Sequence, residues 1–170
     1  MKGQKKNSMK VVNITMKPDE FMSHLKTQIE DFDQHVLRIK TQYSEMKNLK
    51  ENLPDNHCIV HMDFSENYSC KSVQEIQSAY WNQTAVTLHP VVVYYRKAGS
   101  DEIQHKSYVF VSDEMGHNAN TVLAITDKLV PAIKDLLPGV TWVHYWTDSP
   151  TSQYRSKIIF NFIANHKDVH

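Results

Sequence analysis

The hydrophobic pattern of this 170-residue chain changes once, close to Pro54, and that change limits the folds available to it. Before Pro54, apolar side chains recur every three or four residues, which is the spacing of one face of an α-helix. From His57 onward, apolar and polar residues alternate in short runs, as they do in half-buried β-strands. We therefore predict a basic tail at 1–17, a long helix at 18–53 and an α/β domain at 54–170.

The long helix is predicted from its first turn and from its apolar seam. Pro18 suits the first helical position, where proline loses no hydrogen bond, and Asp19 and Glu20 suit the positive end of the helix dipole. From Leu25 onward, the apolar residues are spaced alternately by four and three, which is the seam of a coiled coil. These residues are Leu25, Ile29, Phe32, Val36, Ile39, Tyr43 and Met46. Two interpretations remain open: a helix that covers the domain, or a helix 18–53 that forms a hairpin or a homo-oligomer.

The composition excludes several classes of protein. Lys plus Arg equals Asp plus Glu at 19 each, so no overall basic field points to nucleic acid. The tail at 1–17 is locally basic, and we expect it to be disordered. The two cysteines, Cys58 and Cys70, have no CxxC spacing, and no apolar run is long enough to span a membrane. We expect an intracellular protein with no membrane partner, and the nucleus is one candidate compartment.

The second part of the chain has the pattern of a mixed sheet with helices. The predicted strands are 57–64, 86–96, 103–112 and 140–146, and the predicted helices are 118–137 and 152–165. Pro90 would forfeit a ladder hydrogen bond inside a central strand, so we expect a bulge there or a strand that begins at Val91. If the first three strands form an antiparallel meander, a helical crossover returns the fourth strand parallel to the first.

This order of elements brings two aspartates together. Asp63 lies at the end of the first predicted strand, and Asp148 lies just past the end of the fourth. Neighbouring strands are about 4.8 Å apart, so the two carboxylates would meet at one edge of the sheet. Two like charges at that separation require a cation or a shared proton. We predict that Asp63 and Asp148 are catalytic and bind Mg or Mn, with Glu66 as a candidate third metal ligand.

Other polar residues near these acids are candidates for contacts with a substrate. His61 and His144 each share a strand face with the nearby aspartate, because side chains alternate with a period of two. Either histidine could orient a ligand or contact a phosphate. Tyr154 and Arg155 come at the start of the last predicted helix, where a helix amino end and a cation could hold a phosphodiester. A solvated helix face is the simpler interpretation of the same residues.

A cluster of histidines and cysteines also invites comparison with zinc sites. It consists of His57, Cys58, His61 and Cys70. Strand alternation turns Cys58 to the face opposite His57 and His61, and neither spacing fits a structural zinc site. We therefore do not predict zinc.

Two segments carry a resemblance to a known class of proteins. They are HMDFSENY, at 61–68, and WTDSPTSQY, at 146–154. Over about residues 57 to 166, the chain resembles ribonuclease H-like, DDE/D transposase-derived domains of animal proteins. The resemblance implies a mixed sheet of three antiparallel strands, a helix, a parallel fourth strand and a helix. It also implies metal-dependent cleavage or strand transfer of DNA, with Asp63 and Asp148 as the first two acids and Gln153 beside the substrate.

The chain departs from that pattern in two respects. At Thr147 and Ser149 the related segments more often carry Ser and Gly, and the loss of the glycine affects a tight turn, since only glycine adopts positive φ freely. The class also needs a third acid from a later helix, and after Asp148 the chain has only Asp168. We expect an incomplete domain that is inactive alone. The alternative is a non-catalytic remnant that serves as a binding or oligomerisation module.

Overall fold

The computed structural model describes residues 11–70, 85–97 and 99–165. Contacts within the chain divide it into two units, Met1–Lys47 and Asn48–His170. Of the predicted tail, residues 11–17 form neither helix nor strand, and the remainder lies outside the described residues. The tail therefore contributes no regular structure in the part that the model describes.

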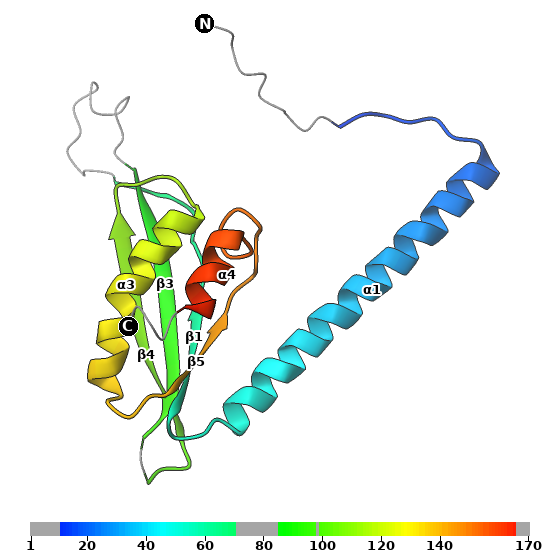
Figure 1. Ribbon diagram of the computed structural model, residues 1–170. Helices are drawn as coiled ribbons and strands as arrows, with labels where there is room; N and C mark the ends of the chain where they lie inside the picture. The colour runs from blue at the N-terminus through cyan, green and yellow to red at the C-terminus, as the bar shows by residue number, and fades with distance from the viewer. Residues whose placement is uncertain (1–10, 71–84, 98, 166–170) are drawn as a thin grey trace, which may run out of the picture. The chain divides into compact units, whose positions relative to one another are not determined.

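Helix α1 is a 34-residue α-helix, Pro18–Glu51, and Figure 1 shows it without interruption. The predicted start at Pro18 is confirmed, and the backbone N–H of Lys17 donates to the Glu20 carboxylate at 3.4 Å. The helix ends shortly before Pro54, whose carbonyl accepts a hydrogen bond from the His57 N–H at 3.0 Å. Proline cannot continue a helix, because its ring clashes with the preceding turn.

The second unit contains a mixed sheet. Strand β1 (His57–Met62) pairs antiparallel with β3 (Ala85–Arg96) and parallel with β5 (Trp142–Trp146). Strand β4 (Ile103–Ser112) pairs antiparallel with β3, and the short β2 (Tyr68–Ser69) pairs with the start of β3. The four longer strands thus follow the order β4, β3, β1, β5, as Figure 1 shows. The predicted parallel pairing of the first and last strands is confirmed.

Strand β3 runs through Pro90 without a bulge, so the prediction of a bulge or a later start is wrong. Pro90 pairs with Val109 of β4, and the next residue, Val91, pairs with Met62 of β1. The Pro90 carbonyl accepts from the N–H of Asp63 at 3.4 Å. Pro90 therefore faces Asp63, the first residue after the end of β1. The hydrogen bond that the proline cannot donate would go to the Asp63 carbonyl, so the loss falls just beyond the end of β1 and not within it.

One face of the sheet packs against two helices, α3 (Ala119–Leu136) and α4 (Lys157–Ala164), as Figure 1 shows. Asn118 caps α3, and its side-chain oxygen accepts from the N–H groups of Asn120 and Thr121. The buried core joins sheet and helices through Cys58, Val60, Met62, Val91, Val93, Val122, Leu129, Ile133 and Ile159. Removal of these apolar groups from water is the main force that holds β1 and its neighbours in place.

The last helix begins later than predicted. We expected a helix from residue 152, but α4 starts at Lys157, with Ser156 as its cap and the Ser156 hydroxyl accepting from the Ile159 N–H at 3.3 Å. The preceding turn forms because the Pro150 carbonyl accepts from the N–H groups of Gln153, Tyr154 and Arg155, at 3.2, 3.0 and 3.1 Å. These three residues therefore precede the helix and do not form its first turn.

Candidate metal centre at the ends of β1 and β5

Two exposed aspartates lie at equivalent positions beyond the ends of the parallel strands β1 and β5. His61 of β1 is in register with Trp146 of β5, so Asp63 and Asp148, each two residues further on, continue the same register. Parallel neighbours are separated by about 4.8 Å, and their carboxyl ends meet at one edge of the sheet. The predicted juxtaposition of Asp63 and Asp148 follows from this pairing.

The electrostatics of Asp148 agree with this proximity. Partial burial raises the pKa of Asp148, and the negative charge of Asp63 raises it further, although a backbone hydrogen bond acts in the opposite direction. A carboxylate whose pKa is raised by a second carboxylate is a site where a cation is favourable, because the cation removes the repulsion. The pair can thus accept a hard divalent ion or a proton.

The loop that carries Asp63 is anchored to β3. The Asp63 N–H donates to the Pro90 carbonyl, and the N–H and hydroxyl of Ser65 both donate to the Leu88 carbonyl, at 3.0 and 3.1 Å. These bonds extend the pairing of β1 and β3 beyond the end of β1. Asp63 therefore has a fixed backbone position, which a preorganised ligand site requires.

Asn67 connects the same loop to two other elements. Its side-chain oxygen lies 2.8 Å from Nε2 of His117 and 3.0 Å from the hydroxyl of Thr87, which also lies 2.8 Å from the Glu114 carbonyl. The His117 ring stacks on Phe64, with centroids 4.5 Å apart and planes 15° apart. Sequence reasoning missed His117 and Thr87, since neither belongs to a motif that indicates its partner.

A second residue that the sequence did not indicate is His89. It is 1% exposed, and its Nε2 lies 2.8 Å from the Tyr154 hydroxyl. Its ring is nearly perpendicular to the Phe64 ring, at 87°, and the two ring centroids are 4.4 Å apart. Burial lowers the pKa of His89 to about 4, although the Asp63 charge acts in the opposite direction. Burial also raises the pKa of Tyr154, as do the charges of Asp63 and Asp148. Both side chains are therefore neutral at physiological pH. Both are close enough to Asp63 for its charge to affect their pKa values.

The predicted substrate-binding residues occupy different environments. Tyr154 is buried and bonded to His89, Gln153 is half-buried, and Arg155 is exposed next to it. His61 is exposed at the end of β1, and burial lowers its pKa, as does Lys50, while Asp63 raises it. Of these side chains, Arg155 and His61 are accessible to a ligand.

His144 lies away from the aspartates. It sits in register with Ile59, and its Nε2 is 3.0 Å from Nδ1 of His57, so the two histidines form a pair of their own. Burial lowers the pKa of His144, and the neighbouring His57 lowers it further. His144 thus contacts His57 within the sheet, whereas Asp148 lies beyond the end of β5 at Trp146.

Two further candidate metal ligands are Glu66, as a third ligand beside the two aspartates, and the cluster of histidines and cysteines, as a zinc site. Glu66 is exposed in the loop after Asp63, where its carbonyl accepts from the Ser65 hydroxyl at 3.1 Å. Cys58 is fully buried in the core, and burial raises its pKa to about 12. Within residues 11–70, 85–97 and 99–165, no group of three or more His, Cys, Asp or Glu side chains is arranged to hold a metal ion. The described site therefore offers two carboxylates, and neither Glu66 nor a zinc cluster completes it.

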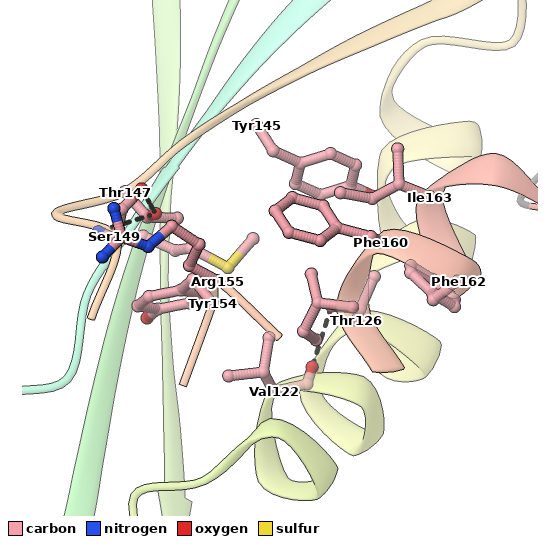
Figure 2. Close-up of a pocket in the computed structure, with 12 residues that line it drawn as sticks. Val122, Thr126, Tyr145, Thr147, Ser149, Tyr154, Arg155, Phe160, Phe162 and Ile163 are labelled. Atoms are coloured by element: carbon pink, nitrogen blue, oxygen red, sulfur yellow. Dashed lines mark hydrogen bonds between the residues drawn. The ribbon is translucent and has the colours of Figure 1, made fainter. Parts of the chain in front are cut away.

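A cavity of about 230 Å³ opens beside Asp148, between the end of β5 and helices α3 and α4. Figure 2 shows Thr147, Ser149 and Arg155 on one side of it and apolar side chains of the helices, such as Phe160 and Ile163, on the other. The Thr147 hydroxyl accepts from the Ser149 N–H at 3.1 Å. Ser149 has a φ of 58°, so it adopts the left-handed conformation at the position where the related segments carry glycine.

Comparison with known proteins adds a family to this geometry. A family model described as a domain of unknown function, DUF8701, matches residues 42–170. The chain belongs to the DUF8701 family. No curated protein and no solved structure matched it. The DUF8701 match covers the end of α1 and the whole sheet with its helices, and no helix among the described residues is long and apolar enough to cross a membrane.

Proposed function

We propose that the DUF8701 domain of this chain is a ribonuclease H-like domain of transposase ancestry whose Asp63 and Asp148 bind Mg or Mn. The observation that carries this proposal is the register of β1 and β5, which puts one aspartate at the same step beyond each of two parallel neighbours. The influence of Asp63 on the pKa of Asp148 supports it, because a cation relieves that repulsion. The reaction of such a domain is metal-dependent cleavage or strand transfer of DNA.

The residues of this chain have distinct parts in that reaction. Asp63 and Asp148 would hold the ion, since magnesium is commonly held by one or two carboxylates together with substrate phosphates. A bound ion would supply Lewis-acid chemistry for in-line displacement at phosphorus. Arg155, which is exposed and lines the cavity beside Asp148, would pair with a DNA phosphate through its guanidinium.

Metal binding tests the first half of the proposal. Titration of the full chain with Mn²⁺, followed by the loss of the free-ion electron paramagnetic resonance signal, should show saturable binding that Asp63→Asn and Asp148→Asn each weaken at least tenfold. Asp113→Asn is the matched control, since Asp113 is an exposed aspartate just after β4. Equal binding by all four proteins would remove the acid pair as the ligand site.

Cleavage of supercoiled plasmid DNA in Mn²⁺ tests the second half. We expect any nicking by the purified chain to be lost in Asp63→Asn and kept in Asp113→Asn, because only Asp63 belongs to the proposed site. Nicking that persists in Asp63→Asn would show that the activity comes from elsewhere.

A second candidate is a non-catalytic remnant that serves as a binding or oligomerisation module. One observation favours it: the described residues bring together two carboxylates and no third ligand, whereas enzymes of this class use at least three acids. Saturable Mn²⁺ binding without nicking of any DNA substrate would favour the remnant over the enzyme.

A further inference from the structure

Helix α1 carries an apolar seam that is exposed except at Val36, which is half-buried, and at Met46, which is buried. In heptad notation, its a positions are Met22, Ile29, Val36 and Tyr43, and its d positions are Leu25, Phe32, Ile39 and Met46. The exposed fractions of Met22, Ile29, Phe32 and Tyr43 are 61%, 52%, 64% and 76%. Apolar seams of this regularity are covered by another helix, because they lose their stabilising contribution if they stay in water.

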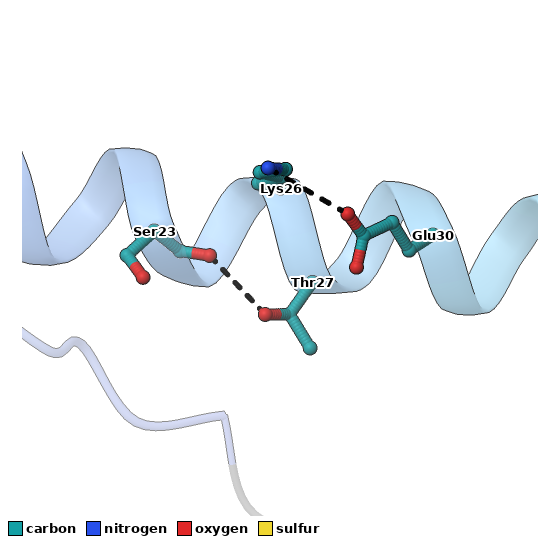
Figure 3. Close-up of polar contacts among 4 residues, drawn as sticks. All are labelled: Ser23, Lys26, Thr27 and Glu30. Carbon is teal, nitrogen blue, oxygen red and sulfur yellow. Dashed lines mark hydrogen bonds and ion pairs between the residues drawn. The ribbon is translucent and has the colours of Figure 1, made fainter.

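The other faces of α1 are mostly polar, with Phe21 and Leu37 as exposed apolar exceptions, and several of their polar side chains have partners within the helix. Figure 3 shows the Thr27 hydroxyl donating to the Ser23 carbonyl at 3.3 Å and Lys26 paired with Glu30 at 3.9 Å. The family match begins at residue 42, so most of the seam precedes the matched region. An apolar seam with heptad spacing packs best against another helix with the same spacing, because each seam side chain then fits between side chains of the partner.

We propose that α1 pairs with α1 of a second copy of this chain as a parallel, two-stranded coiled coil. The proposal deepens the oligomerising form of the second candidate function, and it does not depend on metal binding. Two a positions, Ile29 and Val36, are β-branched, and with Leu25 at a d position they favour a parallel dimer, whereas Ile39 at another d position favours a higher oligomer.

The surface of α1 already contains a hole of the required kind. A depression beside the seam is lined by Met22, Leu25, Lys26 and Ile29 and also by Ser23 and Glu30. The first four occupy successive a, d, e and a positions, and four residues of this kind form the hole that receives a d-position knob from a facing helix. In the parallel register that knob is Leu25 of the second copy.

Charges beside the seam favour the parallel orientation. In a parallel pair, each g residue faces an e residue of the partner's next heptad, and none of these contacts joins two acids or two lysines. The facing residues are Gln28 with Asp33, His35 with Lys40, and Gln42 with Lys47.

The antiparallel alternative is less favourable. The antiparallel register that covers every seam position sets Lys26 against Lys40 and Asp33 against its own copy. Like charges at such positions are destabilising and discriminate against that pairing.

Sedimentation of the full chain tests the number of strands. We expect a dimer at micromolar concentration, a dissociation constant raised at least 100-fold by Val36→Asp, and a change below threefold for Gln34→Asp, which places the same charge on the outer face. A monomeric or trimeric wild-type chain would overturn the proposal, as would equal dissociation of the two variants. Mn²⁺ binding should be the same in Val36→Asp, so failure of the coiled coil and failure of the acid pair are separable.

Disulfide trapping tests the orientation. In a Cys70→Ser background, which removes the exposed native thiol, Leu25→Cys should cross-link to itself under mild oxidation, because equivalent d positions meet in a parallel pair. Thr27→Cys, on the outer face, should remain uncross-linked. A mixture of Leu25→Cys and Tyr43→Cys chains that forms only the mixed disulfide would show an antiparallel pair and overturn the proposed orientation.

Discussion

His89 and Tyr154 meet in the interior of the domain, with Nε2 of the histidine 2.8 Å from the tyrosine hydroxyl, and both side chains are buried. His89 comes from the middle of β3, and Tyr154 comes from the turn between β5 and α4. The hydrogen bond therefore ties the segment that follows Asp148 to the strand that anchors Asp63. Its loss should be detectable in the stability of the whole domain.

Replacement of Tyr154 by phenylalanine should lower the free energy of unfolding by about 1–3 kcal/mol, because a buried hydrogen-bonding nitrogen loses its partner. Urea denaturation measures this change. Tyr68→Phe is the control, since Tyr68 is 59% exposed, and we expect it to change stability by less than about 0.5 kcal/mol. Similar values for the two variants would show that the His89 to Tyr154 bond contributes nothing measurable.

The buried histidine should make stability depend on pH. Burial lowers the pKa of His89 to about 4 in the folded chain, whereas an unfolded histidine titrates near about 6.5. Because the unfolded chain binds the proton first, stability is complete above about pH 6.5 and declines toward pH 4, by up to about 3 kcal/mol. Unfolding free energies measured from pH 4 to pH 7 should show this slope in the wild type and a shallower one in His89→Gln. Parallel profiles would contradict it.

Asp148→Asn should have opposite effects with and without metal. Without metal it removes repulsion from Asp63, so we expect a gain of up to about 1 kcal/mol in the free energy of unfolding. With Mn²⁺ at 100 times the wild-type dissociation constant, the wild type should gain about 2.7 kcal/mol, and the variant, with at least tenfold weaker binding, should gain at most about 1.4 kcal/mol. Thermal unfolding in chelator and in Mn²⁺ measures both. A variant stabilised by Mn²⁺ as much as the wild type would contradict ligation by Asp148.

Ser149→Gly should stabilise the turn beside Asp148. Ser149 has a φ of 58°, and the left-handed region costs a non-glycine residue about 1–2 kcal/mol. Part of the gain is offset by the greater entropy of glycine in the unfolded chain, so we expect a net increase of up to about 1 kcal/mol. Ser152→Gly, in the following turn without a positive φ, should be neutral or destabilising. Equal effects of the two changes would show that strain at Ser149 is negligible.

The sequence predicted the sheet better than it predicted the site. Parallel pairing of β1 with β5 follows from an antiparallel meander of three strands and a helical crossover back to the first, and each of these elements is indicated by many residues at once. In the turn before α4, the Pro150 carbonyl accepts from the N–H groups of Gln153, Tyr154 and Arg155, which in a helix capped by Ser152 would be first-turn donors without an intrahelical acceptor. Pattern alone does not choose between Ser152 and Ser156 as the cap.

The hydrogen bonds among the polar side chains near the acid pair could not be predicted from the sequence either. Alternation in β3 indicates that His89 is buried, but it does not identify Tyr154 as its partner, because that contact joins positions distant in sequence. His117 and Thr87 converge on Asn67 for the same reason. Only Ser149 was indicated in advance, since glycine stands at its position in the related segments.

The parallel pairing of His57 with Trp142 also affects how the protein folds. This contact closes a long loop, and topologies with such non-local pairings fold slowly. The acid pair exists only when β5 is docked on β1, because the register of these two strands brings Asp63 and Asp148 together. Mn²⁺ added during refolding should therefore report completion of the native topology, and binding should lag behind the appearance of helical circular dichroism.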